Sequence, residues 1–199
     1  MVHGPNLSRR RHDHRVFPYL LRGLSITAPN QVWGIDLTYI PLRRTWLYLV
    51  ALLDWYSRYV VEWELGDTMD EEIVLAPVRR ALSQAQPAIL NSDQGSHFTA
   101  KDYVDLVDGA GVLEDALSFL RGFFPWYNRE HRHTGIALLT PETVHFGRSE
   151  QALISRQKVL DAAFDAHPER FAGRRPQVPQ LPKEVWINRP WHASSLQTV

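Results

Sequence analysis

The stretch that decides the fold is QVWGIDLTYI, residues 31–40. It is rich in β-branched and aromatic residues, and Pro29 and Pro41 bracket it, so it predicts a β-strand. Asp36 stands in the middle of this otherwise apolar strand. Because buried carboxylates are usually paired or coordinate metals, Asp36 is the first candidate functional residue of the chain.

The following segments predict the rest of a sheet. Residues 45–65, TWLYLVALLDWYSRYVVEWEL, contain two apolar runs separated by the short polar stretch from Asp54 to Arg58. This pattern is typical of two antiparallel strands joined by a turn. Apolar residues then recur at helical spacing from Asp70, and a short fourth strand, AILNSD, ends at Asp93. The order predicts an α/β fold with a mixed sheet flanked by helices.

Asp36 and Asp93 would meet if the first and fourth strands were neighbours in the sheet, because both carboxylates would then project from the same region. Two hard cations bridged by carboxylates can activate a nucleophilic oxygen and stabilise a leaving alkoxide. Magnesium or manganese suits such an all-oxygen site. The chain has no cysteine, so a zinc site is the poorer choice.

Composition narrows the possible partners and compartment. The chain has 199 residues, 44% of them hydrophobic, which is enough for one sizeable core. No apolar segment of signal-peptide or membrane-spanning length follows the basic N-terminus, so we expect a cytoplasmic protein without a membrane partner. Lys plus Arg equals Asp plus Glu at 22 each, so bulk charge does not favour nucleic acid, although an N-terminal arm is basic through Arg9, Arg10, Arg11 and Arg15.

Aromatic residues and histidines have simpler structural interpretations. We expect the stripe Phe119, Phe123 and Trp126 to pack on the sheet. His131 and His133, in a polar segment, are expected to be surface or DNA-facing side chains and not metal ligands. A helix capped by Ser149 should end near residues 167–168, before an extended Pro-rich tail. Four tryptophans are expected to be core or sheet-face aromatics and not base-stacking platforms: Trp33, Trp46, Trp55 and Trp63.

Several motifs together resemble one family. PNQVWGIDLTYIP, WLYLVALLDWYSRYVVEWEL and NSDQGSHFTA resemble the core of insertion-sequence transposases with a retroviral-integrase-type catalytic domain, and FFPWYNREHRHTGIALLTPETVHFG resembles their C-terminal segment. The likeness runs from about Tyr19 to Pro190. It implies a ribonuclease H-like fold, and cutting and joining of DNA strands by a D,D,E triad that holds two divalent metal ions. By this resemblance Asp36 is the first carboxylate and Asp93 the second.

The third carboxylate of that triad is missing from its expected place. In the family a glutamate lies about 35 residues beyond the second aspartate, on a helix that brings it over the strand carboxylates. Here the chain passes from GAGV directly to LEDALSFLRGFFPWYN, which resembles the segment downstream of that helix. We therefore expect that one strand and most of the catalytic helix are deleted near residues 112–113, and that metal binding is weak or limited to one ion. Neither Glu114 nor Glu130 is expected to substitute, because a metal ligand must be placed by geometry.

The resulting domain prediction has three parts: a basic arm at 1–28, an integrase-type core at 29–148 and a C-terminal helix with a Pro-rich tail at 149–199. The predicted function is a transposase core for DNA integration and transposition, inactive without its third carboxylate. The alternative is a non-catalytic DNA-binding remnant. Expected partners are element ends, target DNA and a second copy of the chain. The expected DNA-binding residues are Arg9, Arg10, Arg11, Arg15, Arg129, Arg132 and Arg148.

Overall fold

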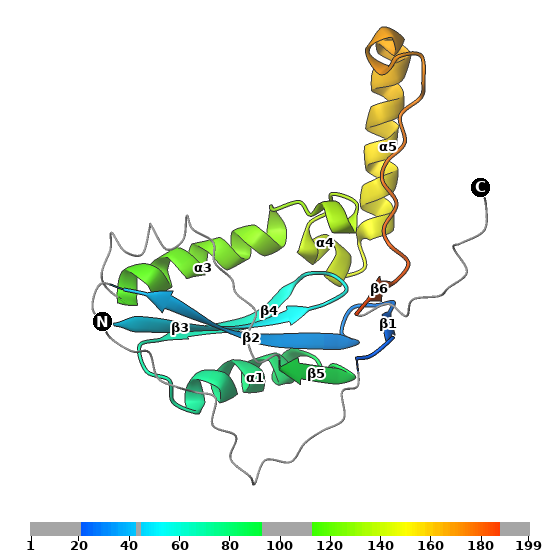
Figure 1. Ribbon diagram of the computed structural model, residues 1–199. Helices are drawn as coiled ribbons and strands as arrows, with labels where there is room; N and C mark the ends of the chain where they lie inside the picture. The colour runs from blue at the N-terminus through cyan, green and yellow to red at the C-terminus, as the bar shows by residue number, and fades with distance from the viewer. Residues whose placement is uncertain (1–20, 43–44, 93–112, 188–199) are drawn as a thin grey trace, which may run out of the picture. The chain divides into compact units, whose positions relative to one another are not determined.

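The computed structural model describes residues 21–42, 45–92 and 113–187 (Figure 1). The chain divides into two compact units, one spanning Ser25–Val185 and the other comprising Met1–Leu24 and Trp186–Val199. The first unit contains the four-stranded sheet and all the helices of the described residues. In the second unit the described residues include two buried apolar side chains, Leu21 and Ile187.

A mixed sheet forms the centre of the larger unit. Its four strands are β2 (Val32–Pro41), β3 (Trp46–Asp54), β4 (Val60–Gly66) and β5 (Ile89–Ser92), in the order β4-β3-β2-β5. The first three form an antiparallel meander, and β5 pairs in parallel with β2. The predicted antiparallel pair, its polar turn and the short fourth strand are all confirmed.

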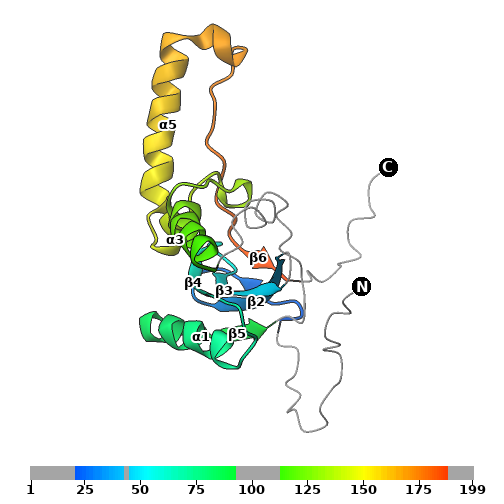
Figure 2. The ribbon, with the colours of Figure 1, turned by 90° about the vertical axis from the view of Figure 1, so that its left-hand side faces the viewer.

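Helices cover the two faces of this sheet. Helix α1 (Glu72–Gln84) lies on one face and α3 (Leu113–Arg129) on the other (Figures 1 and 2). Alternation along β2 divides its side chains between them: Trp33 packs in the cluster with α1, whereas Ile40 packs in the cluster with α3. The confirmed class is therefore α/β, and an antiparallel meander extended by a parallel strand after a helix is the ribonuclease H-like topology.

The face of α3 that packs on the sheet differs from the predicted stripe. Ala116, Leu120 and Phe124 are the buried residues of α3 in the core. They recur every four residues, one position away from the predicted set. Phe119 and Phe123 still pack against this cluster, but Trp126 is 44% exposed, so its predicted packing on the sheet is wrong.

The chain continues after α3 through η1 (Thr134–Ile136) and α4 (Pro141–His145). A longer helix, α5 (Ser149–Ala166), precedes η2 (Pro168–Phe171), and a two-stranded sheet pairs β1 (Ser25–Ile26) with β6 (Val185–Trp186). Helix α5 was predicted with nearly these limits, although Arg148 and not Ser149 occupies the cap position. No helix among the described residues is long and apolar enough to cross a membrane.

Candidate metal and DNA site

Asp36 lies in the middle of β2, on the sheet face that α3 covers. It shares that face with Gly34, Thr38 and Ile40, because side chains alternate along a strand and Ile40 contacts the α3 cluster. Opposite Asp36 on β3 is Ala51. The residue is half-buried, its two carboxylate oxygens are buried, and its neighbours on the same face of β2 and β3 are small.

The strand pairing bears directly on Asp93. The parallel register of β2 and β5 runs from Val32 opposite Ile89 to Ile35 opposite Ser92. The first and fourth strands are therefore neighbours, which is the condition under which the two carboxylates would meet. Asp36 follows Ile35 in the sequence and Asp93 follows Ser92. Asp93 itself lies outside the described residues, so the meeting of the two carboxylates stays a prediction.

A carboxylate whose oxygens are buried in the middle of a strand fits one oxygen ligand of a hard divalent cation. Within 21–42, 45–92 and 113–187, no three His, Asp or Glu side chains form a group that could hold a metal ion. Glu130 is exposed, one residue beyond the end of α3. Glu114 falls in the first turn of α3, and its side chain is outside the described part of the chain. Asp36 is therefore the one predicted metal ligand with a described position.

A second aspartate of the sheet, Asp54 at the end of β3, has a different environment. It is fully buried. One carboxylate oxygen accepts hydrogen bonds from the Ser57 N–H at 2.8 Å and the Ser57 hydroxyl at 2.7 Å, and the other accepts from the Asn30 N–H at 2.6 Å. These contacts close the turn between β3 and β4 and attach it to the segment before β2. Asp54 is a structural residue.

The Ser57 hydroxyl also connects this turn to α4. It donates to Asp54 and accepts from the Tyr59 N–H at 3.2 Å, so its 3.1 Å contact with His145 Nδ1 requires that Nδ1 carry the proton. His145 stacks on Tyr59 with ring centroids 4.4 Å apart. Burial lowers the pKa of His145, although the Asp54 carboxylate opposes that shift. Sequence reasoning missed this network, whose signal was the Asp-x-x-Ser spacing of a side-chain-capped turn.

The two histidines of the predicted polar segment pack with Tyr127. His131 stacks on the Tyr127 ring, and the His131 and His133 rings meet edge to face with centroids 4.5 Å apart. Burial, followed by nearby His131 and Arg58, lowers the pKa of His133. Both histidines are half-buried, and the prediction that they are surface or DNA-facing side chains stays a prediction.

Two of the predicted DNA-binding arginines share one carboxylate. Arg148 binds Glu142 at 2.8 Å and Arg129 binds it at 2.9 Å. Arg148 first, and then Arg129, holds the pKa of Glu142 below its ordinary value. Both arginines remain open to solvent, with side chains 54% and 70% exposed respectively. Arg9, Arg10, Arg11 and Arg15 lie outside the described residues.

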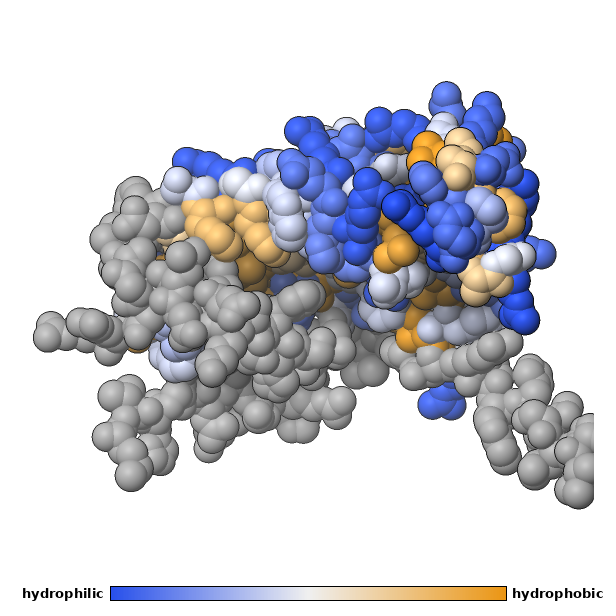
Figure 3. Space-filling view, turned by 90° about the horizontal axis from the view of Figure 1, so that it is seen from above, coloured by the Kyte–Doolittle hydropathy of each residue, from blue (hydrophilic) through white to orange (hydrophobic). Residues whose placement is uncertain are grey.

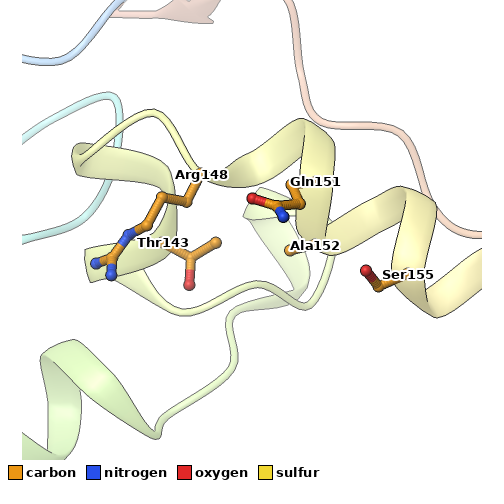
Figure 4. Close-up of a pocket in the computed structure, with 5 residues that line it drawn as sticks. All are labelled: Thr143, Arg148, Gln151, Ala152 and Ser155. Atoms are coloured by element: carbon orange, nitrogen blue, oxygen red, sulfur yellow. The ribbon is translucent and has the colours of Figure 1, made fainter.

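Two shallow pockets lie beside these arginines. A pocket of about 280 Å³ is lined by Thr143, by Arg148 and by Gln151, Ala152 and Ser155 of α5 (Figure 4). A second pocket of about 360 Å³ has a cationic lining. Its residues are Arg129, Arg132, Leu139, Thr140, Thr143, Ala152 and Arg156.

The arginines of the second pocket differ in what they already bind. Arg156 donates to the carbonyls of Ala137 and Leu138, whereas Arg132 is exposed and makes no ion pair within the described part of the chain. Seen from the side where α3 and α5 lie above the sheet, hydrophilic side chains predominate and apolar ones form separate patches (Figure 3). Arg132 is thus the arginine here that is most available to an anionic ligand.

Comparison with known proteins agrees with this geometry. The integrase core domain family matches residues 26–116. An uncharacterized 31 kDa protein of insertion element IS600 from Shigella sonnei is 29% identical over 170 residues, which cover 65% of this chain and 62% of the relative. The transposase of insertion sequence element IS904 from Lactococcus lactis is 34% identical over 112 residues, covering 55% and 42%. Transposase InsF of IS3A from Escherichia coli is 30% identical over 101 residues, covering 49% and 35%.

Among solved structures, the HTLV-2 integrase catalytic core domain in complex with magnesium has a TM-score of 0.47 and 15% identity, covering 60% of this chain and 99% of that one. The sequence match to the integrase core domain over 26–116 includes the four strands of the mixed sheet. The chain is similar to insertion-sequence transposases over this segment. It spans about one third to three fifths of the length of these relatives.

The IS600 match also contains a length difference. It extends over 170 positions but includes 65% of the 199 residues of this chain, which is about 129 residues. About 40 positions of the relative, the difference between 170 and 129, thus have no counterpart here. The loss of one strand and most of a helix near residues 112–113 stays a prediction.

Proposed function

We propose that this chain is an integrase-type transposase core that binds DNA and a divalent cation but has lost the third carboxylate needed for strand cleavage and transfer. The observation that carries the proposal is the β2–β5 register, which ends one residue before Asp36 and Asp93 on the two strands. Its core is the segment 29–148, with 1–28 as a basic arm and 149–199 as a tail. The chain binds element ends and target DNA in the cytoplasm and associates with further copies of itself.

Asp36 and Asp93 would hold the cation, magnesium or manganese, through their carboxylate oxygens. Such an ion, when bound, polarises a phosphodiester and stabilises the charge on its oxygens. With two carboxylates the chain retains one ion loosely, and a second ion lacks a ligand. The gap of about 40 positions against the IS600 protein supports the loss of the segment that supplies the third.

Cleavage and strand transfer on terminal element DNA test this function, first with magnesium and then with manganese. We expect no product from the chain as it stands, and product after the missing segment is restored from an intact relative. Asp36→Asn in the restored chain is the matched control and should abolish product. Activity of the unrestored chain that disappears on Glu114→Gln or Glu130→Gln would show that a substitute carboxylate exists.

The second candidate function is a DNA-binding remnant that uses no metal, and the exposed arginines near Glu142 favour it. Phosphate contacts by Arg129, Arg132 and Arg148, with the arm residues Arg9, Arg10, Arg11 and Arg15, would give weak, salt-sensitive and largely sequence-independent binding. Removal of residues 1–15 should flatten the salt dependence. If DNA binding responds to magnesium in the wild type and not in Asp36→Asn, the metal-free alternative is wrong.

A further inference from the structure

Trp55 lies over the strand that carries Asp36. A Cβ atom added to Gly34 would stand 2.2 Å from the Trp55 indole nitrogen, so the ring occupies the space that a side chain at position 34 would fill. The backbone fixes this position, because the Trp55 N–H donates to the Val32 carbonyl at 3.0 Å and continues the pairing of β3 with β2 beyond Asp54. Gly34 is therefore required for the ring to lie against the strand.

The alternation of β2 puts this ring on the same face as the candidate metal ligand. Gly34 and Asp36 are two positions apart, so their side-chain directions agree and their positions are separated by about 7 Å. The size of a nucleotide is similar to this separation between positions 34 and 36. A phosphate held at Asp36 would therefore place its adjoining nucleoside within reach of the indole ring.

Trp55 is also unlike the other tryptophans of the sheet. Trp33 is fully buried and donates to Asn30, and Trp63 packs against Phe124 of α3. Trp46 is 44% exposed but belongs, by strand alternation, to the opposite face. Trp55 is half-buried, and it is the tryptophan among the described residues that shares the Asp36 face without belonging to either core cluster.

We propose that Trp55 is a positioning residue that contacts the sugar or base of the DNA strand whose phosphate lies at Asp36. This rests on the proposed function, because it requires the cation and the DNA strand at Asp36. Stacking on an aromatic ring tolerates every base, so the contact adds affinity without sequence preference. It changes the expectation that Trp55 is a sheet-face aromatic with no nucleic-acid role.

The test uses the full chain labelled with 5-fluorotryptophan, in which ¹⁹F NMR resolves the individual tryptophans. Trp55→Phe assigns the resonance, and Trp46→Leu is the matched control from the opposite face. Manganese should broaden the Trp55 resonance in the wild type and not in Asp36→Asn. A short duplex with an unpaired end should then shift the Trp55 resonance and leave the Trp46 resonance in place.

Affinity measurements complete the test. Trp55→Leu should weaken binding of the same duplex, followed by fluorescence anisotropy at fixed salt, by about tenfold, whereas Trp55→Phe retains most of it and Trp46→Leu all of it. Thermal unfolding of each variant shows that the chain is folded. One outcome would overturn the inference alone. Manganese would broaden the Trp55 resonance, but DNA would leave that resonance in place and would bind folded Trp55→Leu as tightly as the wild type. The metal site would then stand. If manganese has no Asp36-dependent effect, the proposed metal site is wrong and the inference falls with it.

Discussion

Asp54 and Asp36 are two aspartates of one sheet with opposite surroundings. Asp54, at the end of β3, is fully buried and accepts three hydrogen bonds from Asn30 and Ser57. Asp36, in the middle of β2, is half-buried among Gly34, Thr38 and Ala51. In the sequence, a second aspartate, Asp93, follows directly after the last residue of the neighbouring strand β5. A carboxylate surrounded by backbone donors stabilises a turn, whereas one placed near a second carboxylate favours a cation.

The largest expected effect is the loss of the structural acid. Asp54→Ala removes the acceptor for three buried donors, so we expect the free energy of unfolding to fall by about 3 kcal/mol. Urea denaturation measures it. Asp67→Ala, at an exposed position just after β4, is the control and should change stability by less than about 0.5 kcal/mol. Equal losses for the two variants would contradict the structural role of Asp54.

Asn128, near the end of α3, is a second buried polar residue with a structural role like that of Asp54. Its side chain is buried, accepts from the Val60 N–H at 2.9 Å and donates to the Val60 carbonyl at 2.9 Å, as a neighbouring strand would. Asn128→Leu leaves both groups of Val60 unpaired, so unfolding should become easier by about 2 kcal/mol. Asn128→Asp keeps the acceptor but puts a carboxylate oxygen against the Val60 carbonyl, so it should also lose stability at neutral pH and lose less when the carboxyl group is protonated. A fully stable Asn128→Leu chain would show that water replaces the side chain.

Asp54 and Asn128 show which features of the fold could be predicted from the sequence and which could not. The strand around Asp36 and helix α1 were predictable, because hydrophobic periodicity is local and strong there. The roles of Asp54 and Asn128 depend on partners such as Asn30 and Val60, whose proximity follows from tertiary packing. The buried stripe of α3 was predicted one position out, because several adjacent aromatics fit helical spacing equally well and only the sheet selects among them.

Asp36, the proposed metal ligand, should show its role through cation binding. Manganese at ten times its dissociation constant should stabilise the wild type by about 1.4 kcal/mol, because a ligand that binds only the native state shifts the unfolding equilibrium. Asp36→Asn should remove this stabilisation, and Asp54→Asn should lower stability without removing it. The measurement is the thermal midpoint with and without manganese. Equal stabilisation of wild type and Asp36→Asn would place the cation elsewhere.

The surroundings of Glu142 are intermediate between those of Asp54 and Asp36, because Glu142 is paired with arginines that solvent can reach. Exposed ion pairs contribute at most about 1 kcal/mol, so Glu142→Gln should lower the free energy of unfolding by no more than that. The pKa of Glu142 is lower in the folded chain than in the unfolded one. Its contribution is therefore complete above the unfolded pKa, about 4.3, and is lost as pH falls through the folded value. The difference in stability between wild type and Glu142→Gln should vanish below that window.

The same substitution separates the structural and DNA-binding roles of Arg129 and Arg148. In the wild type their guanidinium groups bind the Glu142 carboxylate, which competes with any phosphate. Glu142→Gln removes that competitor and a negative charge, so DNA affinity and the slope of its salt dependence should both rise, in contrast to the loss of stability. Arg129→Gln in the Glu142→Gln background should reverse the gain. Unchanged affinity in Glu142→Gln would mean that these arginines stabilise the segment between α3 and α5 and do not contact DNA.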